Sequence, residues 1–132
     1  MGNGADKIPV VLVVENNPQV LELLGTLVSS QGWEAVQVST LRDALSSFAA
    51  RSFDAIVADV ELDDGNSIPL LQQARERLPQ SVPTLMISSY ASDTLRSELK
   101  RLGALDLLAK PFRLDDLTHR LKKHIHPEPT IV

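Results

Sequence analysis

The chain contains no cysteine and no long apolar segment, and each absence excludes a class of structure. Without cysteine, the 132 residues can form neither a disulfide nor a cysteine-ligated zinc site, which fits a reducing compartment. No apolar stretch approaches the roughly 20 residues that a membrane-spanning helix needs. The first seven residues lack the apolar core of a signal peptide. We therefore expect a cytoplasmic protein that does not enter a membrane.

Positive charge is also scarce relative to negative charge. There are 13 Lys and Arg residues against 17 Asp and Glu residues, a formal net charge of −4. This balance argues against nucleic acid as a partner. A chain of this length forms one ordinary domain. We expect a single domain over residues 1–132, with a core at about 8–126 and a flexible tail at 127–132 that contains two prolines.

Five apolar runs alternate with five amphipathic segments along the chain. The apolar runs, which read as strands, are 8–14, 33–38, 54–59, 83–87 and 104–109. Asn17, Thr40 and Ser67 are the expected N-caps of the first three helices, and the third helix is expected to carry Leu78 on its apolar face. The last two helices are expected at about 92–102 and 114–125. Strict alternation predicts an α/β fold with a parallel sheet, right-handed crossovers and helices on both faces.

A parallel sheet gathers the carboxyl ends of its strands at one edge, where ligands bind. The polar residues predicted at that edge are Glu15, Asn16, Asp59, Ser88 and Lys110. Each one alone is more commonly a turn, cap or solvated residue. Together, two carboxylates and an amide form an oxygen-rich site suited to magnesium, and a lysine with a hydroxyl suits a phosphoryl group. An aspartate can itself be the nucleophile and form an aspartyl-phosphate.

Four motifs in the correct order carry a resemblance to a known family. They are Val-Val-Glu-Asn-Asn-Pro at 13–18, Asp-Val-Glu-Leu-Asp-Asp-Gly at 59–65, Ser88, and Gly-Ala-Leu-Asp-Leu-Leu-Ala-Lys-Pro-Phe at 103–112. From about residue 8 to residue 125, the sequence resembles the receiver domain of two-component response regulators, which are CheY-like. The resemblance implies a flavodoxin-like, doubly wound (βα)5 fold whose five-stranded parallel sheet has the order 2-1-3-4-5.

The resemblance also implies roles for the residues at the strand ends. Asp59 would accept a phosphoryl group from a histidine kinase or a histidine phosphotransfer protein. Mg²⁺ would be held by Glu15, Asn16, Asp59 and the backbone carbonyl of Glu61. Lys110 would contact the phosphoryl oxygens, and the Lys110–Pro111 bond would be cis. Ser88 would turn inward and donate a hydrogen bond to one phosphoryl oxygen.

The sequence departs from the family pattern at several positions. Asn16 replaces the second acid of the usual pair, which predicts weaker magnesium binding with Asp59 still phosphorylatable. Asp63 and Ser67 replace the common proline and glycine, so the shape of the loop after Asp59 is expected to differ. Leu107 replaces an aromatic residue, so the aromatic part of the family's switch cannot operate in its usual form. The simpler interpretation is that Leu107 packs against the last helix.

Two further positions are expected to tune hydrolysis of the aspartyl-phosphate. Glu61 lies two residues after Asp59, and Tyr90 lies two residues after Ser88. Tyr90 would either shield the site from water or cover the loop. The three histidines, His119, His124 and His126, lie on or after the last helix and are expected to be solvated.

The leading hypothesis is a phospho-accepting signalling module, not an enzyme, that stands alone or forms part of a longer protein. No DNA-binding segment follows the last helix, so we expect output through protein–protein contacts. A homodimer through the fourth helix, fifth strand and fifth helix is one form of such contact. The alternative is a degenerate receiver that binds proteins without phosphorylation, which Asn16 and Leu107 favour. An aspartyl-nucleophile phosphatase is disfavoured, because such enzymes carry Asp-x-Asp after the first strand and a cap domain.

Overall fold

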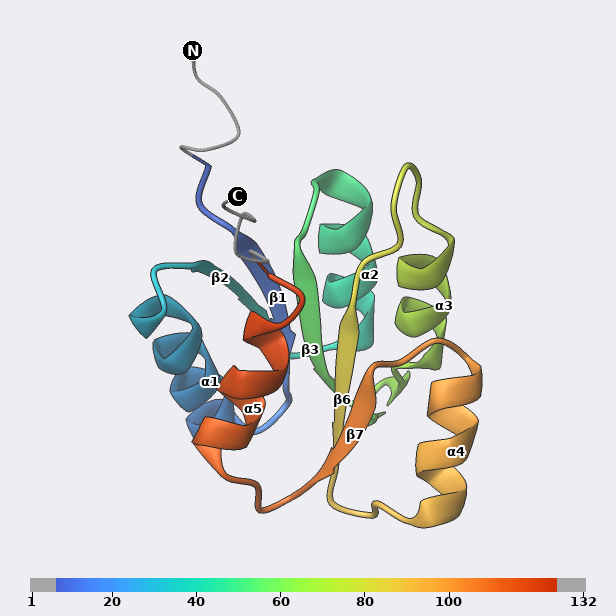
Figure 1. Ribbon diagram of the computed structural model, residues 1–132. Helices are drawn as coiled ribbons and strands as arrows, with labels where there is room; N and C mark the ends of the chain where they lie inside the picture. The colour runs from blue at the N-terminus through green and yellow to red at the C-terminus, as the bar shows by residue number, and fades with distance from the viewer. Residues whose placement is uncertain (1–6, 126–132) are drawn as a thin grey trace, which may run out of the picture.

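Five parallel strands form the central sheet of the computed structural model, which describes residues 7–125 (Figure 1). From one edge to the other, the strands are β2 (Glu34–Val38), β1 (Val10–Val14), β3 (Ala55–Asp59), β6 (Thr84–Ser88) and β7 (Asp106–Ala109). Numbered along the chain as strands of this sheet alone, their order is 2-1-3-4-5. The predicted flavodoxin-like, doubly wound architecture is therefore confirmed.

Every strand pairing in this sheet is parallel and in a continuous register. Leu12 of β1, for example, lies between Val36 of β2 and Ile56 of β3. Asp59 at the end of β3 is paired with Ile87 of β6. The carboxyl ends of all five strands consequently meet at one edge, the lower edge in Figure 1.

Helices cover both faces of the sheet. α1 (Pro18–Ser30) and α5 (Leu114–Lys122) lie on one face, and α2 (Leu41–Ala50), α3 (Ile68–Glu76) and α4 (Asp93–Arg101) lie on the other (Figure 1). Alternate residues of β3 point to opposite faces: Ile56 and Ala58 pack toward α2–α4, whereas Ala55 and Val57 pack toward α1 and α5. Both sets are fully buried, which explains why this strand is an unbroken apolar run.

The helix starts follow the N-cap chemistry predicted from the sequence at two positions. The Asn17 side chain accepts a hydrogen bond from the backbone N–H of Val20 at 3.1 Å. The Thr40 hydroxyl accepts one from the backbone N–H of Asp43 at 3.0 Å. These bonds satisfy amide donors that a helix leaves without partners in its first turn.

Ser67 lies at the N-cap position of α3, but its predicted capping bond is wrong. Its hydroxyl donates to the backbone carbonyl of Asp59 at 2.6 Å. The first amide of α3, on Ile68, donates instead to the side chain of Asn66 at 3.0 Å. The Ser67 hydroxyl thus supplies a hydrogen bond to the buried carbonyl of Asp59, and leaving a buried polar group without a partner would lower the stability of the fold.

The loop after Asp59 contains a small antiparallel hairpin that the sequence analysis did not predict. It consists of β4 (Glu61–Leu62) and β5 (Gly65–Asn66). At its turn, the Asp64 carboxylate accepts hydrogen bonds from the backbone amides of Leu41 and Arg42 at 2.8 and 3.0 Å. These bonds lower the pKa of Asp64. The hairpin therefore ties the loop after Asp59 to the amino end of α2.

Two predictions about apolar residues are wrong. Leu78 is 83% exposed, because the chain leaves α3 at Arg77 and the residue before Pro79 is disfavoured in a helix. Leu107 shares its buried cluster with Leu99 of α4, whereas the buried apolar residues of α5 belong to the other cluster. Leu107 therefore packs on the α4 side of the sheet and not against the last helix.

The remaining expectations concern the peptide bond before Pro111, the histidines, the tail and membrane-spanning helices. The Lys110–Pro111 bond is cis, as the resemblance implied. His119 and His124 are exposed as predicted, whereas His126 and the predicted flexible tail lie outside the described residues. Within residues 7–125, no helix is long and apolar enough to cross a membrane.

Candidate functional site

Three charged side chains meet at the carboxyl edge of the sheet. Asp59 ends β3, Glu15 follows β1, and Lys110 follows β7. The Lys110 ammonium lies 2.6 Å from Oδ2 of Asp59 and 2.8 Å from Oε1 of Glu15. The two carboxylates are almost fully buried, with side-chain exposures of 5% and 1%, and the lysine side chain is 19% exposed. One ammonium thus faces two buried carboxylates.

The pKa values of two of these groups reflect burial and mutual charge. Burial raises the pKa of Glu15, and the negative charge of Asp59 adds to this, while Lys110 and the backbone N–H of Asn17 oppose it. Burial alone would lower the pKa of Lys110, but the hydrogen bonds and charges of Asp59 and Glu15 outweigh it and raise that pKa. The lysine therefore remains an ammonium at neutral pH.

The backbone around Asp59 fixes the position of its carboxylate. Oδ1 accepts a hydrogen bond from the backbone N–H of Glu61 at 3.2 Å, and Oδ2 accepts the bond from Lys110. The carbonyl of Asp59 is held by Ser67, and the next amide, that of Val60, donates to Ile87 of the neighbouring strand at 2.7 Å. Asp59 is therefore held by both its side chain and its backbone.

Ser88, the last residue of β6, joins this group indirectly. It is fully buried. Its hydroxyl donates to Oε2 of Glu61 at 2.7 Å and accepts a hydrogen bond from the backbone N–H of Tyr90 at 2.8 Å. Its carbonyl accepts a bond from the backbone N–H of Lys110 at 2.9 Å. The backbones of Ser88 and Lys110 are therefore in direct contact, whereas the Ser88 hydroxyl faces Glu61.

The Asn16 side chain contacts the loop that follows Asp59. Its side-chain NH₂ group donates to Oδ1 of Asp63 at 3.1 Å, which links the loop after β1 to the hairpin after β3. The amide oxygen of Asn16 is not the atom that makes this contact. The departures at positions 16 and 63 therefore form one interacting pair: an aspartate at 16 would face a second carboxylate at 63.

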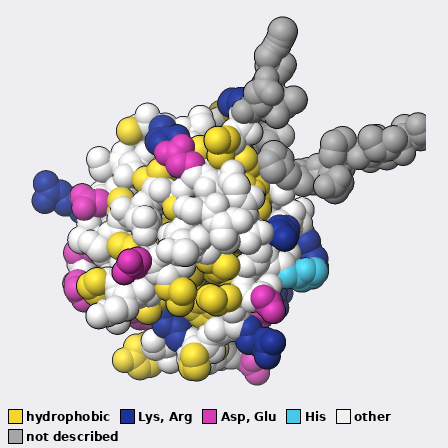
Figure 2. All heavy atoms as spheres, turned by 90° about the vertical axis from the view of Figure 1, so that its left-hand side faces the viewer, with side chains coloured by type: hydrophobic (Ala, Val, Ile, Leu, Met, Phe, Trp, Pro, Cys, Tyr) yellow, Lys and Arg dark blue, Asp and Glu magenta, His cyan; other side chains and the backbone are white. Residues whose placement is uncertain are grey.

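An apolar groove lies beside Lys110. It has a volume of about 450 Å³ between α1 and the connection from β7 to α5, and is lined by Val20, Leu23, Ser89, Lys110, Pro111, Phe112 and Leu114. Leu23 is 46% exposed and Leu114 is 36% exposed. Figure 2 shows hydrophobic side chains gathered in the lower part of the side that carries α1 and α5. Tyr90 is 76% exposed, so its ring does not shield the site in this state.

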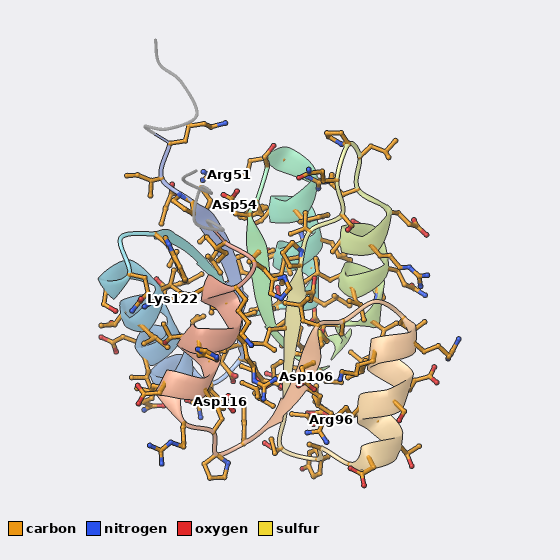
Figure 3. All side chains as sticks on the ribbon, viewed as in Figure 1. Arg51, Asp54, Arg96, Asp106, Asp116 and Lys122 are labelled. Carbon is orange, nitrogen blue, oxygen red and sulfur yellow. The ribbon has the colours of Figure 1, made fainter. Side chains whose placement is uncertain are left out.

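A second charged network lies away from Asp59 and connects α4, β7 and α5. Asp106 accepts hydrogen bonds from Arg96 of α4 and Arg120 of α5, and Arg120 also pairs with Asp116. In Figure 3, Arg96, Asp106 and Asp116 come from these three neighbouring elements. Burial would raise the pKa of Asp106, but the Leu107 amide and the surrounding cations lower it. Much of the mixed charge on this face is therefore paired within the chain.

The residues present fit a magnesium ion, although with few charged ligands. Oε1 of Glu15 is buried and, apart from its ion pair with Lys110, accepts no hydrogen bond of good geometry within the described residues. Magnesium prefers oxygen ligands and keeps several waters, which suits two carboxylates, an amide and a backbone carbonyl. No group of three His, Cys, Asp or Glu side chains in residues 7–125 is arranged to hold a metal ion. At position 16, where the resemblance implies a second acid, Asn16 offers an amide in place of a carboxylate.

The structure brings the predicted site residues together in three groups. Glu15, Asp59 and Lys110 are in direct contact, Ser88 connects to Asp59 through Glu61, and Asn16 connects to Asp63. For Glu61, the sequence predicts a role of the backbone carbonyl and of its position in the motif, but not the contact between its carboxylate and Ser88. The hydrogen bond from Ser67 to the carbonyl of Asp59 is likewise not predicted. The polar loop 61–67 was the only signal for both.

Comparisons with known proteins agree with this geometry. A family model for the response regulator receiver domain matches residues 11–122. The KDP operon transcriptional regulatory protein KdpE of Escherichia coli is 30% identical over 112 residues, which cover 85% of this chain and 49% of KdpE. The response regulator protein PilR of Pseudomonas aeruginosa is 30% identical over 106 residues, which cover 80% of this chain and 24% of PilR. The chain thus spans half or less of the length of these relatives.

A solved structure gives the same result at the level of the fold. The non-phosphorylated HemR receiver domain from Leptospira biflexa aligns with a TM-score of 0.81 at 25% sequence identity, covering 94% of this chain and 99% of that chain. The family match extends over nearly all of the described residues. The chain belongs to the response regulator receiver domain family of two-component systems.

Proposed function

We propose that Asp59 accepts a phosphoryl group from a phosphohistidine on a histidine kinase or a histidine phosphotransfer protein. A carboxylate oxygen of Asp59 attacks phosphorus, the P–N bond breaks, and its electron pair returns to the imidazole nitrogen, which takes up a proton. The observation that carries this proposal is the position of Asp59, a nearly buried carboxylate held between the Lys110 ammonium at 2.6 Å and the Glu61 amide at 3.2 Å. Phosphoryl transfer depends mainly on such positioning and charge neutralisation.

Lys110 supplies the positive charge for this reaction. Its raised pKa keeps it protonated, and its contacts with Asp59 and Glu15 support a role in which its ammonium contacts phosphoryl oxygens on Asp59. An ammonium binds phosphoryl oxygens as a point charge, without a fixed geometry, so it can remain in contact with the group while the bond to Asp59 forms. Lys110 therefore compensates the carboxylates before transfer and the phosphoryl group after it.

Magnesium would be held by Glu15, Asn16, Asp59 and the backbone carbonyl of Glu61. When bound, the ion would neutralise negative charge on the phosphoryl oxygens. With Asn16 in place of an acid, only two carboxylates face the ion, so we expect magnesium to bind more weakly than it would at a site with a full acidic pair. The asparagine still offers an amide oxygen.

Output through protein–protein contacts completes the proposal. The apolar groove is lined in part by Lys110, a residue of the site, which supports contact between this surface and a protein donor. The face formed by α4, β7 and α5 is the proposed output surface and could also join two copies of the chain. Because Asp106 already pairs with Arg96 and Arg120, a partner at this face would meet a charge network that is largely satisfied.

Incubation with acetyl phosphate and magnesium, followed by intact mass measurement, tests the phosphorylation proposal. We expect a gain of one phosphoryl group that is absent in Asp59→Asn. Asp63→Asn is the matched control, because it removes an exposed carboxylate from the same loop and should still be phosphorylated. If the wild-type protein gains no mass and beryllofluoride does not perturb Asp59 or Ser88, the alternative of a phosphorylation-independent binding module replaces this proposal.

A further inference from the structure

The Ser88 hydroxyl has a single proton, and the structure shows where that proton is used. The hydroxyl donates to Oε2 of Glu61 at 2.7 Å and accepts from the backbone N–H of Tyr90 at 2.8 Å. Because Ser88 is fully buried, water cannot readily replace either partner. A hydroxyl can donate only one hydrogen bond at a time. Any other acceptor of this proton must therefore displace Glu61.

We propose that Glu61 is a positioning residue whose carboxylate competes with the phosphoryl group for the Ser88 proton. This inference rests on the proposed function, in which Ser88 donates to a phosphoryl oxygen on Asp59. The bond to Glu61 holds Ser88 in its unphosphorylated arrangement. Phosphorylation must break that bond before the new one can form, so Glu61 sets the balance between the two arrangements of Ser88.

The backbone of Glu61 makes this competition local to the phosphorylation site. The Glu61 amide donates to Oδ1 of Asp59, while its carboxylate accepts from Ser88. One residue thus contacts both the acceptor and the hydroxyl. A phosphoryl group on Asp59 would bring further negative charge toward the Glu61 carboxylate, and like charges repel. The same event therefore offers Ser88 a new acceptor and repels the old one.

The hairpin holds Glu61 in this position. Glu61 pairs with Asn66 across β4 and β5, and Asp64 anchors the turn to the amides of Leu41 and Arg42. The Glu61 side chain is only half-buried, so it can move to solvent when Ser88 releases it. The carboxylate can therefore leave without moving the hairpin, and the backbone bond to Asp59 does not depend on the Ser88 contact.

A double-mutant cycle with beryllofluoride, a mimic of the phosphoryl group, separates this competition from simple charge repulsion. The four proteins are the wild type, Glu61→Ala, Ser88→Ala and the double variant, all measured at one pH with saturating magnesium. Backbone amide shifts in NMR spectra, including that of Tyr90, report binding. Glu61→Ala should tighten beryllofluoride binding both in the wild-type background and in the Ser88→Ala background, because it removes a negative charge. The gain in affinity should be roughly tenfold larger when Ser88 is present than when it is alanine. That difference measures the competition for the Ser88 proton.

Three further measurements sharpen the test. Asp63→Ala removes a nearby negative charge that contacts Asn16 rather than Ser88, so its effect should be the same with and without Ser88→Ala. In the unliganded protein, Glu61→Ala should release the Ser88 side chain from a single rotamer, which the couplings of its β protons report. Glu61→Gln keeps a hydrogen-bond acceptor without the charge, so its beryllofluoride affinity should lie between those of the wild type and Glu61→Ala.

The outcomes distinguish this inference from the proposed function. If none of the four proteins binds beryllofluoride, the proposed function is wrong and this inference is wrong with it. If they bind it but Glu61→Ala has the same effect with and without Ser88→Ala, the proposed function stands and the competition is refuted. An excess effect that requires both residues, together with a freed Ser88 rotamer, supports the competition.

Discussion

Lys110→Met should strongly destabilise the fold, because it leaves two buried carboxylates without their shared cation. The methionine keeps the length of the lysine stem, so the change removes the charge with little loss of packing. Glu15 and Asp59, with side-chain exposures of 1% and 5%, would then face each other. Two unit charges about 5 Å apart at an effective dielectric of 20 repel by about 3 kcal/mol. Removing one partner of a buried ion pair typically costs about 3–5 kcal/mol, so both routes give the same magnitude.

The loss should depend on pH in a definite direction. Burial already raises the pKa of Glu15, and Lys110 is the main group that opposes this rise. Without Lys110 the pKa rises further. An acid whose pKa is raised by folding holds its proton more tightly in the folded state than in the unfolded state. The free energy of unfolding is therefore higher at low pH and falls as the pH rises through the folded-state pKa. The deficit of Lys110→Met should therefore be largest near pH 8 and should shrink toward pH 5.

Urea unfolding at pH 5, 6, 7 and 8 in the presence of a chelator measures this loss, since a bound metal could replace the missing charge. At pH 8 we expect a decrease of about 3–5 kcal/mol in the free energy of unfolding, or roughly 10–15 °C in Tm. Lys122→Met, on the exposed end of α5, should change stability by less than about 0.5 kcal/mol. Adding Glu15→Gln to Lys110→Met should recover much of the loss. A deficit below about 1 kcal/mol at pH 8, or one of equal size at pH 5, would refute the reasoning.

Three other substitutions have defined outcomes. Asp106→Asn should lower the free energy of unfolding at pH 7 by about 1–3 kcal/mol. The pKa of Asp106 is lowered by folding, so its stabilisation is lost as the pH falls through that pKa, and urea unfolding near pH 3 should show little difference from wild type. Asn16→Asp should tighten magnesium roughly tenfold in a calorimetric titration, since each added pair of unit charges contributes about 1 kcal/mol at 4 Å even in water. Equal magnesium affinities would contradict this expectation. Without magnesium the substitution should lower the free energy of unfolding, because the new carboxylate would face Asp63, and unchanged urea unfolding would contradict that second point. Ser67→Ala should cost about 1–3 kcal/mol in urea unfolding and weaken beryllofluoride binding, because the buried carbonyl of Asp59 loses its donor.

The fold was predictable because its signals are local and agree with one another. The buried run at 54–59, the N-caps Asn17 and Thr40, and the alternation of strands and helices each indicate the same topology. The meeting of Glu15, Asp59 and Lys110 followed from parallel strands alone, since all three residues lie at carboxyl ends. Periodicity and strand direction were sufficient for this part of the site.

The loop from 61 to 67 was not predictable in the same way. Its side chains choose among several nearby partners, and the choice depends on distances of a few tenths of an ångström that no pattern in the sequence encodes. Ser67 had the right type and position for a cap, yet its hydroxyl serves the carbonyl of Asp59. Glu61 had an obvious place in the motif, yet its contact with Ser88 requires β3 and β6 to be adjacent and in register.

Leu107 shows how these local choices bear on signalling. Leu107 is 1% exposed and packs in the same buried cluster as Leu99. Because it is a leucine, it has no aromatic ring that could move between an inner and an outer position. Its backbone carbonyl accepts a hydrogen bond from the guanidinium group of Arg96 at 2.9 Å, so the Arg96 side chain ties α4 to the backbone of β7. If phosphorylation of Asp59 alters α4, we expect the change to travel by another route. The connection from Ser88 through the Tyr90 amide to the start of α4 is the shortest covalent path, and Ser88 is the residue whose hydrogen bond phosphorylation would change. We therefore expect the hydrogen-bond partner of the buried Ser88 hydroxyl, and not the position of an aromatic ring, to change when Asp59 is phosphorylated.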